Sequence, residues 1–241
     1  MAKDDRAPAA GENPLAPKSA RADIDAFLDK ARTLTAAKAS TGRRGRLVFA
    51  LDATMSRQPT WDIACSLQAD MFTEAASVGG LDIQLVYFRG IGECRASRFV
   101  ADARELGSLM GRITCHGGHT QIGRVLNHTR RENAANKVQA LVYVGDAMEE
   151  KLDDLCAAAG ELGILGVPAF LFQEGDDPVA EQAFREMARL TNGAYCKFSP
   201  GSAHELAELL RAVAAYAAGG LKALESARRG SAAAKLLAQM K

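Results

Sequence analysis

The chain has 241 residues, of which 48% are hydrophobic and 24% are charged, and its formal net charge is +1. This composition is that of an ordinary globular domain, and the near-neutral charge excludes a uniformly basic nucleic-acid-binding protein. No apolar run approaches the roughly 20 residues of a membrane-spanning helix. The first 20 residues carry charges and prolines where a secretory signal would be apolar. Together with five scattered cysteines, these features predict a cytoplasmic protein with reduced thiols and no membrane segment.

Charge is distributed unevenly along the chain. Residues 1–46 and 219–241 each carry a net charge of +4, whereas residues 47–218 hold 15 basic and 22 acidic side chains, a net −7. We interpret the basic ends as solvated tails, and docking arms for an acidic partner or for RNA are the alternatives. Because the ends lack interleaved aromatic residues, base stacking is unsupported and no nucleic-acid partner is expected.

The N-terminal region is not predicted to be part of a folded core. Residues 1–20 are rich in Ala, Pro, Gly and Lys, and they are predicted to be a disordered tail. Apolar residues then recur every three or four positions, which predicts a helix and a short linker over 21–45.

Buried strands alternate with helices from residue 46 onwards. Strands are predicted at 47–51, 81–88, 94–100, 138–144, 167–172 and 194–198, of which 94–100 is a weak edge strand. Helices are predicted at 61–78, 103–112, 122–133, 149–162, 178–190 and 203–218, the last ended by Gly219 and Gly220. This alternation predicts a doubly wound α/β fold over 46–218, with a mostly parallel sheet covered by helices on both faces. Residues 219–241 are predicted to be a helical tail, with one loosely attached helix at 232–240.

Oxygen-bearing side chains follow three of the predicted strands and loops. Asp52, Thr54 and Ser56 come directly after the first strand, Thr120 follows a Gly-Gly pair at a helix start, and Asp146 ends the 138–144 strand. In a doubly wound fold, ligands bind at the carboxyl ends of the strands. Carboxylate and hydroxyl oxygens suit Mg²⁺ or Mn²⁺ rather than a soft metal. Each segment taken alone is also compatible with a polar loop or a helix N-cap.

The ordered trio of segments resembles the von Willebrand factor A (VWA) domain family. The sequence D-A-T-M-S is similar to the family's D-x-S-x-S loop, with Asp52 and Ser56 unchanged and Thr54 in the middle position. G-G-H-T-Q-I-G is similar to the family's G-G-G-T-x-I-G loop and aligns Thr120. V-G-D-A is similar to the T-D-G stretch and aligns Asp146, with Ala147 where glycine is usual. The resemblance covers roughly 46–217 and implies a Rossmann-like VWA fold of the bacterial cytoplasmic type.

The resemblance also implies a function. Asp52, Thr54, Ser56, Thr120 and Asp146 would bind Mg²⁺ or Mn²⁺, directly or through water, as a metal-ion-dependent adhesion site (MIDAS). An open coordination position would accept an Asp or Glu side chain of a partner protein. Because cytoplasmic relatives often accompany ATPases or chaperone-like assemblies, such an assembly is the implied class of partner.

Competing functions remain open. The first is a structural VWA-like domain with a vestigial metal site. The second is a Mg²⁺-dependent phosphohydrolase with Asp52 as nucleophile, although Thr54 occupies the position of the acid/base carboxylate that such an enzyme needs. The chain has no Walker-type, dinucleotide-binding or G-x-S-x-G motif, so we predict a protein that is not an enzyme.

Three neighbouring features have plainer interpretations. Cys115, His116 and His119 do not match the spacing of a closed zinc site. Glu149 and Glu150 are expected to cap the helix that follows them rather than repel an acidic ligand. A single tryptophan, Trp61, is expected in the core or over the helix start.

Overall fold

The computed structural model describes residues 44–76, 80–227 and 231–240. The tail predicted at 1–20 therefore lies outside the described residues. The same holds for the region predicted as a helix and linker over 21–45, except for the last two residues of that region. The strands are β1 (Gly45–Asp52), β2 (Leu81–Arg89), β3 (Glu93–Val100), β4 (Ala140–Gly145), β5 (Ala169–Glu174) and β6 (Ala194–Phe198). The helices are α2 (Gln58–Ala76), α3 (Ala103–Met110), α4 (Ile122–Ala135), α5 (Leu152–Ile164), α6 (Pro178–Leu190), α7 (Ala203–Ser226) and α8 (Ser231–Leu237), with a 3-10 turn η1 (Met55–Arg57) before α2.

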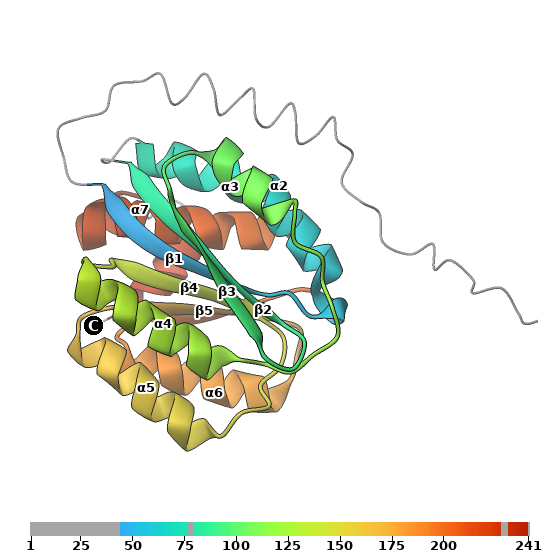
Figure 1. Ribbon diagram of the computed structural model, residues 1–241. Coiled ribbons are helices and arrows are strands. Elements are labelled where there is room, and N and C mark those ends of the chain that lie inside the picture. The colour runs from blue at the N-terminus through green and yellow to red at the C-terminus, as the bar shows by residue number, and fades with distance from the viewer. Residues whose placement is uncertain (1–43, 77–79, 228–230, 241) are drawn as a thin grey trace, which may run out of the picture.

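The strands form one six-stranded sheet in the order β3-β2-β1-β4-β5-β6 (Figure 1). Strands β2, β1, β4, β5 and β6 run parallel, and only β3 is antiparallel to its neighbour β2. The chain moves outward from β1 to one edge and then to the other, which is the doubly wound topology. The predicted fold is confirmed, including the edge position of the weak strand near residues 94–100.

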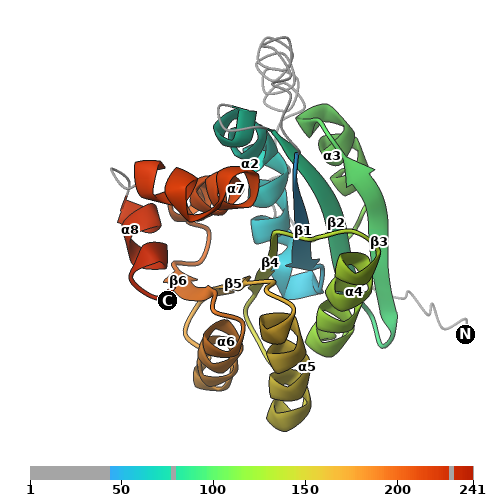
Figure 2. The same cartoon turned by 90° about the vertical axis from the view of Figure 1, so that its left-hand side faces the viewer.

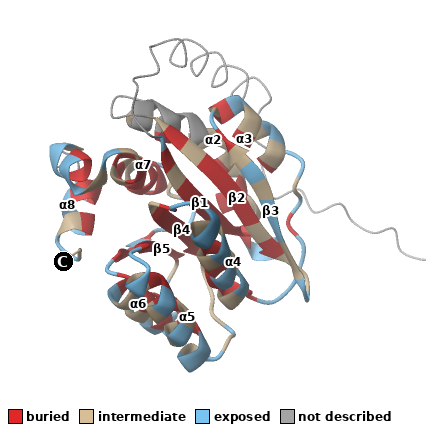
Figure 3. Ribbon diagram, turned by 60° about the vertical axis from the view of Figure 1, so that its left-hand side comes forward, coloured by how far each residue is buried: buried red, intermediate tan, exposed pale blue. Residues whose placement is uncertain are grey.

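Helices cover both faces of the sheet (Figure 2). Alternate residues of β1 point to opposite faces: Leu47 and Phe49 pack in the core under α2, α3 and α7, whereas Val48 and Ala50 pack in the core under α4, α5 and α6. All four are fully buried, and Figure 3 shows the same burial along the central strands. Burial on both faces is the reason that this strand is a continuous apolar run in the sequence.

Trp61 lies in the core, which is one of the two positions predicted for it. Its side chain is 2% exposed and meets the ring of Tyr87 edge-on at 6.3 Å. Its indole N–H donates to the carbonyl oxygen of Met110 in α3. Trp61 therefore ties the start of α2 to β2 and α3, directly behind the loop that follows β1.

The C-terminal helices agree with the prediction at one point and differ at another. Helical geometry is interrupted at Gly220, with φ of 70° and ψ of −162°, so α7 consists of two helical segments that meet at a kink, and the predicted end at Gly219 and Gly220 is confirmed. Glycine tolerates this backbone conformation because it has no Cβ. Helix α8 is not loosely attached, because Ala232, Ala233 and Leu236 are buried in the core. Among the described residues, no helix combines the length and apolar composition that crossing a bilayer requires.

Candidate metal centre

The first predicted site residue, Asp52, is the last residue of β1, at the carboxyl edge of the sheet. Its side chain is 3% exposed, and its Oδ1 accepts a hydrogen bond of 2.7 Å from the backbone N–H of Thr54. Burial raises the pKa of Asp52 from 3.8 to about 6; the bond from Thr54 opposes this rise, and the charge of Asp146 adds to it. Asp52 forms no ion pair among the described residues, and the charge of Arg57 opposes the rise in its pKa only as the smallest of these influences.

Hydroxyl groups connect this loop to the end of β4. Thr54 Oγ1 lies 3.4 Å from Ser56 Oγ, and Ser56 Oγ donates to Asp146 Oδ2 over 3.3 Å. Four of the five predicted residues are therefore brought together at one edge of the sheet. The group contains two carboxylates, two hydroxyls and no nitrogen or sulfur donor, which is the chemistry that Mg²⁺ prefers in proteins.

The fifth predicted residue, Thr120, is engaged with a different partner. Its Oγ1 accepts from the backbone N–H of Glu149 at 3.0 Å, and its own N–H donates to Glu149 Oε2 at 2.9 Å. We find no hydrogen bond between Thr120 and the other four predicted residues. The reciprocal pair instead joins the loop before α4 to the loop after β4, so Thr120 holds these two loops together.

The Gly-Gly pair before Thr120 has an internal packing role at one of its two positions. A Cβ on Gly118 would lie 2.3 Å from the backbone nitrogen and oxygen of Gly90, in the turn between β2 and β3. A Cβ on Gly117 would meet nothing within 4 Å. Gly118 is therefore required where two backbone segments touch.

The expected role of Glu149 and Glu150 is corrected by the structure. They were expected to cap the helix that follows them, but α5 begins at Leu152 and receives no side-chain cap. Glu150 instead accepts from the N–H groups of Ile122 and Gly123, at the start of the earlier helix α4. A carboxylate at this position satisfies N–H groups that have no partner within the helix. The capping prediction had the right chemistry and the wrong helix.

Sequence reasoning missed two charged residues of the site, Arg57 and Glu174. Glu174 ends β5, 7% exposed, and accepts from the Arg57 guanidinium, from the Thr60 hydroxyl and from Gly201 N at 2.8 Å. Arg57 is 3% exposed, and its Nη1 also lies 3.7 Å from Asp146 Oδ2. The signal for Glu174 was present, because an acid follows shortly after the apolar run F-L-F, just as Asp52 and Asp146 follow theirs.

The structure offers no support for a zinc site. Among the described residues, no three His, Cys, Asp or Glu side chains lie close enough to hold a metal ion. His119 Nδ1 instead lies 3.2 Å from Glu149 Oε2, and His116 Nε2 lies 3.1 Å from Thr114 Oγ1. The candidate metal centre consequently has only two carboxylates, and the remaining donors are hydroxyls and water.

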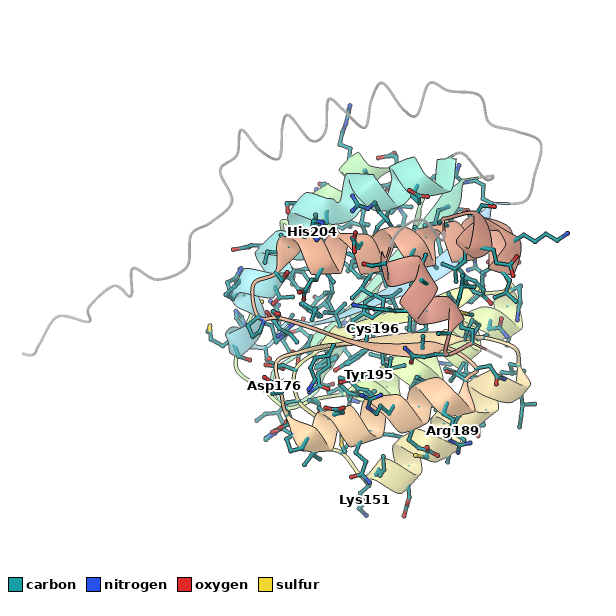
Figure 4. All side chains as sticks on the ribbon, turned by 180° about the vertical axis from the view of Figure 1, so that it is seen from behind. Lys151, Asp176, Arg189, Tyr195, Cys196 and His204 are labelled. Carbon is teal, nitrogen blue, oxygen red and sulfur yellow. The ribbon has the colours of Figure 1, made fainter. Side chains whose placement is uncertain are left out.

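A separate cavity of about 650 Å³ lies along edge strand β6, and Figure 4 labels Asp176, Tyr195, Cys196 and His204 of its lining. Gln239 closes part of this edge, because its side-chain amide accepts from Tyr195 N and donates to Tyr195 O, both at 2.9 Å. Among the cations of this cavity, Lys197 contacts Asp176 at 3.1 Å, and Arg185 pairs with Glu181 and lies over the Tyr195 ring. The lining also contains acidic side chains, so the positive charge of this cavity is largely balanced within the protein.

Comparison with known proteins identifies the class of fold. No family model and no curated protein matches the chain. Solved structures do match it. The VWA domain of SpRpn10 is 14% identical, covers 69% of this chain and 95% of its own, and has a TM-score of 0.54. The vWF domain of the type V pili tip protein Mfa5 from Porphyromonas gingivalis is 13% identical, covers 73% and 95%, and has a TM-score of 0.55.

A third structure, an aerotolerance-related membrane protein from Bacteroides fragilis, is 17% identical over 69% of this chain and 96% of its own, with a TM-score of 0.53. The described residues therefore have the fold of a von Willebrand factor A domain, which confirms the fold that the sequence motifs implied.

Proposed function

We propose that this protein is a non-enzymatic interaction module that binds an acidic side chain of a partner protein through a divalent cation. The observation that carries the proposal is the connected group of Asp52, Thr54, Ser56 and Asp146 at the carboxyl edge of a VWA fold. Mg²⁺ or Mn²⁺ is the proposed ion, because all donors are hard oxygens.

The charges around Asp52 support a cation at this place. A buried carboxylate without a cation close to it is costly, and a divalent ion between Asp52 and Asp146 would offset both negative charges. Thr54 and Ser56 would supply neutral oxygen atoms. Thr120 would join them only if its hydroxyl turns from Glu149 N to the ion or to an ion-bound water.

The ion would leave coordination positions to water and to a partner, because few protein oxygens surround it. An Asp or Glu carboxylate of a partner would complete the shell. An ATPase or chaperone-like assembly in the cytoplasm is the proposed class of partner and place of action, on the strength of the motif resemblance alone.

The alternative is a VWA-like domain whose site has lost its ion, and thermal unfolding separates the two. A ligand that binds only the native state stabilises it by about 2.7 kcal/mol at a hundredfold excess over the dissociation constant. For a domain of this size we expect 5 mM Mg²⁺ or Mn²⁺ to raise the midpoint by roughly 5 to 10 °C over EDTA. We expect Asp52→Asn to abolish that rise.

The matched control is Asp176→Asn. This change removes an exposed carboxylate just beyond the carboxyl end of β5, and it should leave the rise of the unfolding midpoint intact. If the wild-type midpoint is the same in EDTA and in both cations, the vestigial-site reading replaces the proposal. A phosphohydrolase would instead be indicated by cation-dependent cleavage of a phosphate ester that Asp52→Asn removes.

A further inference from the structure

A groove of about 460 Å³ lies between helix α4 and edge strand β3. Figure 2 shows these two elements side by side at one end of the sheet. The β3 side contributes the small side chains of Cys94 and Ala96, and the α4 side contributes long basic ones. Space remains between them because small residues on the strand face extended residues on the helix.

The helix side of the groove follows from the spacing of α4. Arg124, Asn127, His128 and Arg131 recur at intervals of three, one and three residues, so they share one face of the helix. The apolar face of the same helix buries Ile122, Val125 and Leu126 against the sheet, among other residues. The basic face of α4 is therefore adjacent to its buried apolar face rather than on the opposite side of the helix. It is directed toward β3.

The groove has a strong positive charge with little internal compensation. Arg95, Arg124, Arg130 and Arg131 line it, and no acidic residue does. Arg130 pairs with Glu161, but Arg124 donates only to neutral groups, including the carbonyl oxygen of Gly92.

Arg95 and Arg131 form no ion pair within the described part of the chain. Burial raises the pKa of the Cys94 thiol at the base of the groove; the charges of Arg124 and Arg131 oppose the rise, and the charge of Glu150 adds to it.

Acidic side chains near the groove are already committed elsewhere. Glu132 contacts Arg46 and the Gln84 amide, and Glu150 accepts from the N–H groups at the start of α4. The cavity along β6 has about the same number of cations, but those pair with protein acids. Arg124 and Arg131 form no ion pair among the described residues, so their guanidinium groups repel each other and an anionic ligand would relieve that repulsion.

We propose that this α4–β3 groove binds an acidic peptide segment of a partner protein through carboxylate–guanidinium pairs. From Arg124 to Arg131 the helix rises about 10 Å, which matches three to four residues of extended peptide. Alternate side chains of such a peptide face the same side, so two carboxylates would meet the arginines. Arginine binds carboxylates in a bidentate manner, which gives each pair geometric specificity.

The groove favours an acidic peptide over a nucleic acid for two reasons. None of its lining residues is aromatic, so it provides no platform for base stacking. Residues 47–218 carry a net charge of −7, which would repel the remainder of a long polyanion beyond the groove. A short acidic segment meets the positive groove without extending over that acidic surface. This binding requires no cation and is independent of the proposed metal site.

The experiment measures binding of a fluorescein-labelled hexaglutamate peptide to the full chain by fluorescence anisotropy, in EDTA and at low salt. EDTA removes any bridging through a divalent ion, so failure here and failure of the metal proposal are distinguishable. We expect the double variant Arg124→Glu/Arg131→Glu to bind at least tenfold more weakly than the wild type. Both residues are exposed, and Arg124→Gln/Arg131→Gln provides a milder variant if charge reversal disturbs folding.

The control is Arg104→Glu/Arg112→Glu, which makes the same change of net charge at exposed positions in and just after α3. The basic ends of the chain are present in every variant, so only the difference between the doubles reports on the groove. Equal losses in the two doubles, or no measurable binding by the wild type, would overturn the proposal. Tighter binding of a labelled hexauridylate than of hexaglutamate, lost in the groove variants, would assign the groove to nucleic acid instead.

Discussion

Two buried carboxylates, Asp52 and Glu174, end parallel strands at the same edge of the sheet, and their surroundings differ sharply. Glu174 accepts from a guanidinium, a hydroxyl and a backbone N–H, supplied by Arg57, Thr60 and Gly201. Asp52 accepts hydrogen bonds only from Thr54 among the described residues and forms no ion pair there, although the charge of Arg57 acts on it weakly. The chain provides its own cation for one carboxylate and leaves the other to be neutralised by a proton or by an external cation.

Arg57 connects the two carboxylate environments. Its Nη1 binds Glu174 and also lies 3.7 Å from Asp146, the second carboxylate of the candidate metal centre. Its Nε is buried without a hydrogen-bond partner among the described residues. Arg57 therefore stabilises Glu174 strongly and weakens the attraction of Asp146 for a metal ion.

The largest expected effect comes from Arg57→Met, which leaves Glu174 buried and without a cation. Breaking a buried pair by removing one partner typically costs about 3 to 5 kcal/mol, because the remaining charge is uncompensated. We expect a loss of that size in the free energy of unfolding, measured with urea in EDTA at pH 7.5.

The double variant Arg57→Met/Glu174→Leu serves as the control, because replacing both charges with apolar groups of similar volume is often neutral. We expect it to recover most of the loss. A loss below about 1 kcal/mol in the single variant would mean that Glu174 is not paired as the structure shows, and the contrast with Asp52 would disappear.

The second effect concerns Asp52→Asn and has the opposite sign. The pKa of Asp52 is about 6 in the folded protein and 3.8 in the reference state, so the native protein retains a proton that the unfolded chain has lost. Ionisation of Asp52 therefore costs stability, which is lost as pH rises from about 4 to 6. In EDTA, Asp52→Asn should be more stable than the wild type above pH 6, by up to about 3 kcal/mol.

The measurement is the difference in unfolding free energy between Asp52→Asn and the wild type, as a function of pH, because other titrations then cancel. The difference should vanish near pH 3.5, where both side chains are neutral. A variant that is less stable than the wild type at pH 8 in EDTA would show that Asp52 is already compensated by the protein.

The smallest effect on folding is expected for Ser56→Ala. Ser56 is exposed, and its hydroxyl makes only long contacts of 3.4 Å with Thr54 and 3.3 Å with Asp146. We expect a change within about 0.5 kcal/mol in EDTA, as for most surface substitutions. If Ser56 supplies an oxygen to an ion, the rise of the unfolding midpoint with Mg²⁺ should nevertheless be reduced, and an unchanged rise would remove Ser56 from the site.

The sequence predicted the sheet well because burial on both faces leaves a clear mark. Strand β1 was expected at 47–51 and is Gly45–Asp52, and the weak alternation at 94–100 was placed at an edge, where β3 lies. The edge position explains the weak signal, since β3 has one neighbouring strand and many exposed side chains. The helix end predicted at Gly219 and Gly220 coincides with the break in helical geometry at Gly220, although a second helical segment continues from there to Ser226.

The candidate metal centre was only partly predictable. Asp52, Thr54, Ser56 and Asp146 follow strands that lie next to each other, so the rule that ligands gather at strand ends was enough to group them. The partner of Thr120 was not predictable, because Glu149 is 29 residues away in the sequence. Arg57 likewise gave no signal as a partner of Glu174, which lies 117 residues further along.

The sequence by itself determined the order of strands and helices, the faces that are buried, and the residue types at the carboxyl edge of the sheet. These are local properties, since periodicity and strand ends depend on residues that are close together in the sequence. Only the tertiary structure decided which charges meet. Arg57 pairs with Glu174, Glu150 caps α4, and strand β3 lies across a groove from the arginines of α4, because sheet topology brings distant segments within hydrogen-bonding and Coulombic range.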